Sequence, residues 1–87
     1  MNAVRINNHS ELNESLISYW KIEDGTWLIF LPDKRIEHFN GLLGALRLHT
    51  VEEHDDGTIT VSPSILVTNK NITRHGFLVK GVWKECD

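Results

Sequence analysis

Histidine is the residue type in this sequence with the widest range of possible chemistry, and five histidines occur among 87 residues. Neutral imidazole binds zinc, iron and nickel, and mixed sites of histidine and carboxylate are common. A metal-binding domain or small metal-dependent enzyme would draw on these candidates: His38, His49 and His75, with His54 as a fourth and Glu37, Glu52 or Asp55 as carboxylate ligands. No HxH or HExxH spacing places two of them on one face. The sequence therefore favours solvated histidines and no cofactor, with the metal site as an alternative.

Four carboxylates lie close together in one predicted turn: Glu52, Glu53, Asp55 and Asp56. A calcium site of the EF-hand type needs ligands at set alternating positions and a distant glutamate, and that pattern is absent. A solvated hairpin turn is the favoured interpretation. The alternative is a protein-binding loop that docks into a basic groove or imitates a phosphate backbone.

Two further stretches carry nucleophilic side chains. Ser62-Pro63-Ser64 lacks the G-x-S-x-G motif, so we interpret it as a strand break whose hydroxyls bond to nearby backbone. Convergence of a serine with His75 in space remains an alternative. Cys86 is the only cysteine, so no intramolecular disulfide forms, as is usual in a reducing cytosol. We predict no catalytic residue.

Charge and length narrow the possible classes. The formal charge is −3, and the nine Lys and Arg residues are scattered, which argues against direct binding to nucleic acid. The first residues lack the apolar region of a signal peptide, and no apolar run is long enough to span a bilayer. We expect a single cytoplasmic domain over residues 1–87. The core of so short a chain is small.

The elements that must position these residues are mostly strands. Asp24-Gly25 between β-forming residues predicts a hairpin, and the strand Trp27–Leu31 has two apolar faces, which is typical of a central, covered strand. The stretch Ala45–Val67 predicts two strands joined by the acidic turn and a break at Pro63. Turns recur at three glycines, Gly25, Gly57 and Gly81. We therefore predict a mainly β fold, an antiparallel meander or sandwich of about five to seven strands.

One short helix is predicted near the N-terminus, over Glu11 to Tyr19. Its apolar residues recur at helical spacing, and Asn8 or Ser10 would cap it. A strand over Leu16 to Ile22 competes for the same residues. The aromatic residues are predicted to fill the core, with one or two as alternative anchors for a partner: Tyr19, Trp20, Trp27, Phe30, Phe39, Phe77 and Trp83.

The string DGTITVSPSILV at residues 56–67, followed by RHGFLVKGVW at 74–83, resembles small phage and prophage domains with a T-x-S-P-S-[I/L] pattern. The resemblance covers about the last third of the chain and implies a β-rich fold and a mobile-element origin. Many such domains also carry cysteines suited to a metal. Here Arg74 precedes His75 and no other cysteine precedes Cys86, so this chain lacks the cysteines that such a metal site would use.

These observations lead to three functional hypotheses. The first is a non-enzymatic protein-binding module in the cytoplasm of a bacterial host, which inhibits or modulates a host or defence complex. The second is the metal-binding domain or metal-dependent enzyme described above. The third is a structural or assembly subunit that forms homo-oligomers by pairing exposed strand edges.

Overall fold

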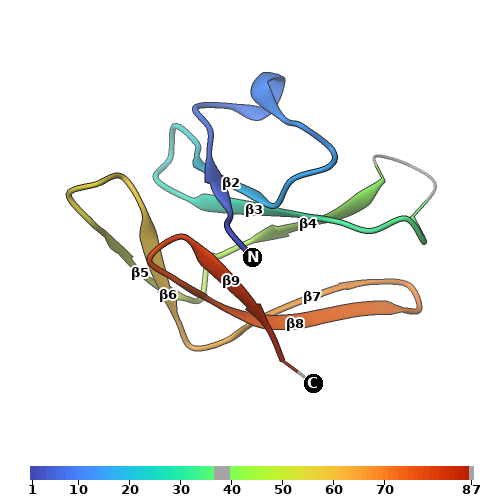
Figure 1. The fold of residues 1–87 in the computed structure, drawn as a ribbon. Helices are drawn as coiled ribbons and strands as arrows, with labels where there is room; N and C mark the ends of the chain where they lie inside the picture. Colours follow the sequence, from blue (N-terminus) through green and yellow to red (C-terminus); the bar gives the residue numbers. More distant parts are fainter. Residues whose placement is uncertain (37–39, 87) are drawn as a thin grey trace.

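The computed structural model describes residues 1–36 and 40–86 and contains three small sheets (Figure 1). The first has the order β1-β2-β3-β4, the second is the hairpin β5-β6, and the third has the order β7-β8-β9. The predicted mainly β fold is confirmed, although the described residues form nine strands where five to seven were predicted. The strands are β1 Val4–Arg5, β2 Ser18–Lys21, β3 Trp27–Pro32, β4 Gly41–Ala45, β5 Thr50–Glu53, β6 Ile59–Ser62, β7 Ile65–Asn69, β8 Ile72–Val79 and β9 Val82–Glu85.

The predicted helix over Glu11–Tyr19 is wrong. A single 3-10 turn, η1 (His9–Glu11), follows the cap residue Asn8, and the chain then enters β2. The four residues 17–20 are all buried, because β2 is paired on both edges and covered on both faces. A strand buried on both faces carries apolar residues at consecutive positions. Some of these residues are then three or four positions apart, which is also the spacing of apolar residues on one face of a helix. The competing strand prediction was the correct one.

The hairpin predicted at Asp24-Gly25 is present. Gly25 has a positive φ of +88°, but Asp24 does not, so the turn is not the type I′ turn, in which both residues have positive φ. Strand β3 lies between β2 and β4, so it is central as predicted. Ile29 and Leu31 face the main core, whereas Phe30 is buried on the opposite face. In Figure 1 the segment 6–17 loops over that side of β2 and β3.

The ribbon predicted over Ala45–Val67 begins later than expected. Ala45 ends β4, residues 46–49 form a turn in which Leu48 is 95% exposed, and β5 starts only at Thr50. β5 pairs antiparallel with β6, and the turn between them closes at Gly57. The break predicted at Pro63 is confirmed, since it separates β6 from β7 and marks the change from the second sheet to the third.

The core gathers buried side chains from all three sheets. β4 crosses β7 where Gly44 leaves room for the Val67 side chain. The N-terminal residues join two sheets, since β1 pairs in parallel with β2 while Asn2 forms an antiparallel bridge with Val82 of β9. Among the described residues, no helix has the length and apolar character needed to cross a membrane.

Candidate functional site

Glu52, Glu53, Asp55 and Asp56 all lie in the β5-β6 hairpin, and two of these four carboxylates are bonded to other residues of the chain. Glu53 pairs with the Arg5 guanidinium at 2.8 Å, and this hydrogen bond lowers the pKa of Glu53. Asp56 accepts hydrogen bonds from the Thr58 hydroxyl at 2.6 Å and its backbone N–H at 3.0 Å, which lower the Asp56 pKa. Only the other two, Glu52 and Asp55, have no ion pair or turn contact among those described, and both are exposed. Their role as a docking loop stays a prediction.

Two of the candidate histidines meet at one serine. His75 Nε2 lies 2.7 Å from Ser64 Oγ, and His49 Nε2 lies 3.0 Å from the Ser64 carbonyl oxygen. Because a carbonyl only accepts, His49 Nε2 carries the proton, and its buried Nδ1 has no hydrogen-bond partner among the described residues. The predicted alternative that a serine of Ser62-Pro63-Ser64 converges with His75 is therefore confirmed in geometry.

The remaining histidine predictions do not join this group. His54 Nε2 lies 2.7 Å from Thr60 Oγ1 within its own hairpin. His38 and its neighbour Glu37 lie outside the described residues. Within residues 1–36 and 40–86, no group of three or more His, Cys, Asp or Glu side chains could hold a metal ion.

The Ser64–His75 contact has the spacing of a nucleophile and its base, but such pairs also need a third group that orients the base. No described carboxylate bonds to His75 and could orient it. His49 does not orient His75 either, because it bonds to the Ser64 carbonyl oxygen. These hydrogen bonds fasten the segment before β7 to β8 and to the 46–49 turn. The arrangement therefore holds the edge of the third sheet in place.

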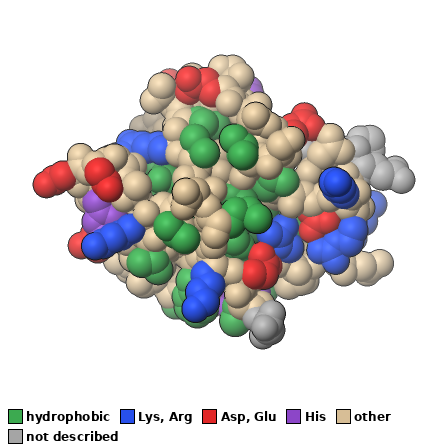
Figure 2. Space-filling view, in the orientation of Figure 1, with side chains coloured by type: hydrophobic (Ala, Val, Ile, Leu, Met, Phe, Trp, Pro, Cys, Tyr) green, Lys and Arg blue, Asp and Glu red, His purple; other side chains and the backbone are tan. Residues whose placement is uncertain are grey.

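The two faces of the third sheet differ sharply. The register pairs Leu66 with His75, Phe77 with Lys84 and Val79 with Val82, which puts these residues on one side of the sheet. Four of them are large, apolar and exposed, and we call them the outer apolar face: Leu66 (62% exposed), Phe77 (42%), Val79 (51%) and Val82 (44%). Figure 2 shows hydrophobic side chains in the upper, middle and lower parts of the view, and Figure 1 places the N-terminus and β9 in the middle of the same view.

The inner face of the same sheet is packed and buried. Leu78 is fully buried, and the Trp83 ring lies directly over Gly76, where an added Cβ would sit 2.4 Å from the ring. Glycine is required there because the indole occupies the space of a side chain. This close contact keeps β8 and β9 flat against the core and leaves their other side toward solvent.

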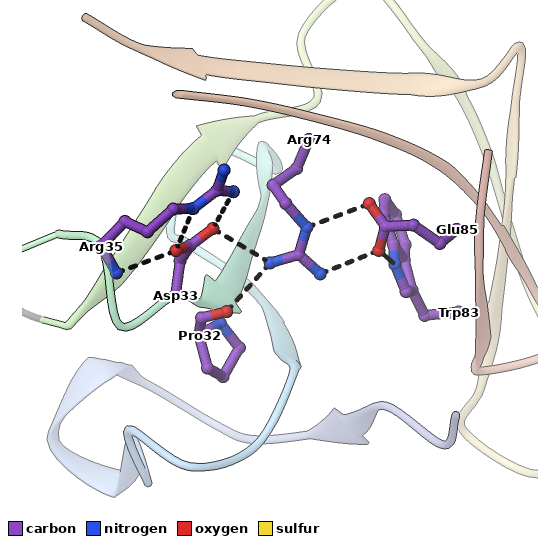
Figure 3. Close-up of polar contacts among 6 residues, drawn as sticks. All are labelled: Pro32, Asp33, Arg35, Arg74, Trp83 and Glu85. Carbon is purple, nitrogen blue, oxygen red and sulfur yellow. Dashed lines mark hydrogen bonds and ion pairs between the residues drawn. The ribbon is translucent and has the colours of Figure 1, made fainter. Parts of the chain in front are cut away.

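An ion-pair network attaches the inner face to the first sheet (Figure 3). Arg74 of β8 donates to the Pro32 carbonyl at 2.9 Å and lies 3.7 Å from the carboxylate of Asp33, just after β3. The Arg35 guanidinium donates two hydrogen bonds, of 2.9 and 2.6 Å, to the same carboxylate. The Asp33 side chain is only 7% exposed, so it depends on these cations for compensation.

The network continues across to β9. Arg74 Nε and Nη2 make a two-pronged contact with the Glu85 carboxylate at 3.0 and 2.9 Å. The Trp83 Nε1–H donates to Glu85 at 2.8 Å, which also fixes the indole over Gly76. Bidentate Arg–carboxylate pairs are geometrically restrictive. The network therefore sets the position of β8 and β9, and with it the outer apolar face.

Hydrogen bonding lowers the pKa of both carboxylates in the network. The Arg35 hydrogen bonds hold the pKa of Asp33 at about 2, against burial, which acts in the opposite direction. The Arg74 hydrogen bonds lower the pKa of Glu85, and the Trp83 N–H adds to this effect. Both groups are therefore charged at neutral pH and through mildly acidic conditions.

The sequence interpretation missed both the network and the outer apolar face. Asp33 is far in the chain from Arg74 and Glu85, and no spacing rule connects the three. The face did leave a signal, because Phe77-Leu78-Val79 is apolar at both alternating positions and Leu66 lies opposite the core-facing residues of its strand. Such a pattern predicts a strand with two apolar sides, of which only one is covered here.

Comparison of the chain with protein-family models, with curated proteins and with solved structures finds no match.

Proposed function

We propose that this chain is a non-enzymatic protein-binding module and that it binds its partner through the outer apolar face. The observation that carries the proposal is the group of four exposed apolar side chains on one side of the β7-β8-β9 sheet. Single exposed apolar residues are ordinary, whereas adjacent ones on a regular surface often mark an interaction site.

The energetics support this use of the face. Full burial of a large apolar side chain contributes about 1.5 to 3 kcal/mol before the costs of association are subtracted, and these side chains, which are 42 to 62% exposed, would each contribute part of that. Phe77 supplies an aromatic side chain, a type that is enriched in the cores of interfaces. The sheet behind it is held by Trp83 and Arg74, so little order is lost on binding. A rigid, apolar platform of this kind suits recognition of another protein.

The resemblance to phage and prophage domains makes a host or defence protein the expected partner. Under this proposal the chain acts by covering a surface of that protein in the bacterial cytoplasm, as an inhibitor or modulator. The acidic residues Glu52 and Asp55 lie on a separate hairpin and would make a second, smaller contact.

The test is photo-cross-linking combined with affinity capture from host lysate. A photoreactive amino acid at position 77 should cross-link to one protein, and the same group at position 48 should not, because Leu48 is 95% exposed but lies in a turn outside the face. Capture should fall at least about tenfold in a Leu66→Lys/Val79→Lys variant and stay unchanged in Leu48→Lys.

The controls make the result decisive. Each variant must retain the melting temperature of the parent chain within a few degrees, which is the shift expected of surface substitutions. Equal capture by all variants, or the absence of a cross-linked protein at micromolar concentration, would contradict the proposal.

A further inference from the structure

We infer that the outer apolar face binds a partner segment whose apolar side chains are bordered by carboxylates. The inference rests on the proposed function and adds the charge of the partner.

The face is bordered by cations that are not paired within the described chain. Lys84 points outward opposite Phe77, and Lys80 is exposed in the turn that joins Val79 to Val82. Neither lysine takes part in any of the six ion pairs formed among residues 1–36 and 40–86. The backbone N–H of Lys80 donates to Thr60 Oγ1, and Thr60 is paired with the exposed Glu52, so Lys80 lies beside the β5-β6 hairpin. Lys84 lies on the outward side of the sheet, and its ammonium group is available to a partner.

Carboxylates are missing from the outward positions of the same sheet, as far as the described residues show. The strand register gives these outward residues: Leu66, Thr68, Thr73, His75, Phe77, Val79, Val82 and Lys84. Glu85, the one carboxylate of the described β7-β8-β9 sheet, bonds to Arg74 and Trp83 on the inner side. The chain carries a formal charge of −3, so this apolar surface with basic neighbours contrasts with the molecule as a whole.

Complementary charge is how interfaces select partners, since like charges brought together are costly and opposite charges fix register. A two-fold symmetric contact between copies of this face would bring Lys84 of each copy toward the same apolar patch. Nucleic acid is also a poor match, because its binding proteins neutralise several phosphates and only two lysines border this face. A segment of another protein with carboxylates beside its apolar residues fits best.

A matched pair of synthetic peptides tests the inference. Both peptides form an amphipathic helix with the same leucine face; one has glutamate and the other lysine at the flanking positions. In an NMR titration of the labelled full chain, the glutamate peptide should shift the amides of the outer apolar face and bind about tenfold more tightly than the lysine peptide.

Charge variants sharpen the result. Lys84→Glu should abolish the preference for the glutamate peptide, and Lys84→Arg should retain it. Lys70→Glu serves as the matched control, because Lys70 is exposed in the β7–β8 turn, away from the face, and this variant should bind as the parent chain does.

The outcomes separate the two proposals. Shifts at the face of equal strength with both peptides would overturn the inferred charge and leave the proposed function standing. Absence of binding by either peptide, or tighter binding of oligothymidylate or anionic vesicles to the same residues, would overturn the inference. The cross-linking experiment at position 77 tests the proposed function by itself.

Discussion

The two sides of the third sheet share three strands and a single register, yet they differ in almost every property. The inner side is closed by the Trp83 ring over Gly76 and by the Arg74 network, whereas the outer side leaves Leu66, Phe77 and Val79 in water. Stability and recognition are thus separated by the alternation of side chains along a strand. Substitutions on one side should disturb folding, and those on the other should disturb binding.

The largest effect is expected at Gly76. Gly76→Ala places a Cβ 2.4 Å from the Trp83 ring and 2.6 Å from the Lys84 carbonyl oxygen, so the indole or the strand has to move. We expect a loss of about 3 kcal/mol or more in the free energy of unfolding, measured by urea denaturation.

A matched variant on the other side is the control for Gly76→Ala. Val79→Thr keeps a β-branched side chain at an exposed position of the same strand and should change the unfolding free energy by less than about 0.5 kcal/mol. Similar losses of unfolding free energy in the two variants would show that the two faces do not differ in their contribution to stability.

A smaller effect is expected when the network loses its most buried carboxylate. Asp33→Asn removes the charge that Arg35 and Arg74 share, and should cost about 1 to 2 kcal/mol after allowance for solvent screening. Asp24→Asn is the control, since that carboxylate is 57% exposed and lies 3.7 Å from Arg47. An equal response of the two variants would show that the network contributes nothing beyond a surface pair.

The same carboxylate predicts how stability depends on pH. The pKa of Asp33 falls from 3.8 in the unfolded chain to about 2 in the folded protein. Its contribution is therefore complete above pH 3.8 and is lost as the pH falls toward 2. The parent chain should lose stability over this range more steeply than Asp33→Asn, as followed by circular dichroism during acid titration; parallel curves would contradict the assignment.

Among the variants that remove a contact, the smallest loss of stability is expected at Ser64. Ser64→Ala deletes the hydroxyl bonded to His75 but leaves the backbone carbonyl that His49 contacts. We expect a loss of about 1 kcal/mol, as for a single neutral hydrogen bond, with the hydrogen-exchange protection of β7 reduced more than that of β3. Unchanged protection in β7 would show that the contact does not hold this edge.

The sequence predicted the parts of the fold that depend on local chemistry. Backbone preferences of glycine and proline predict the turn at Asp24-Gly25 and the break at Pro63. The apolar residues on both faces of β3 predict its central position. The short helix was wrong because burial on both faces of β2 creates the same spacing as a helical face. The start of β5 was misplaced because Leu46 and Leu48 alternate with polar residues inside a turn.

The candidate site was harder to predict because it is made by contacts between distant segments. Ser64 and His75 were considered together, but their meeting with His49 depends on how the 46–49 turn packs. The exposed face could have been suspected from Phe77-Leu78-Val79. Whether a second apolar side is covered depends on the packing of other elements, which local sequence does not specify.

The N-terminal residues have a consequence for how this chain folds. The amino group of Met1 and the carbonyl of Trp83, 82 positions apart, share a hydrogen bond of 3.1 Å, and Val4 donates to Ile17 only three residues further along. Two sheets are thus completed by the same few residues, after nearly the whole polypeptide has been arranged. Closing so long a loop costs chain entropy, and contacts between residues far apart in the sequence slow folding. We therefore expect the hydrogen bonds of residues 1–4 to be among the last to form, in a cooperative step.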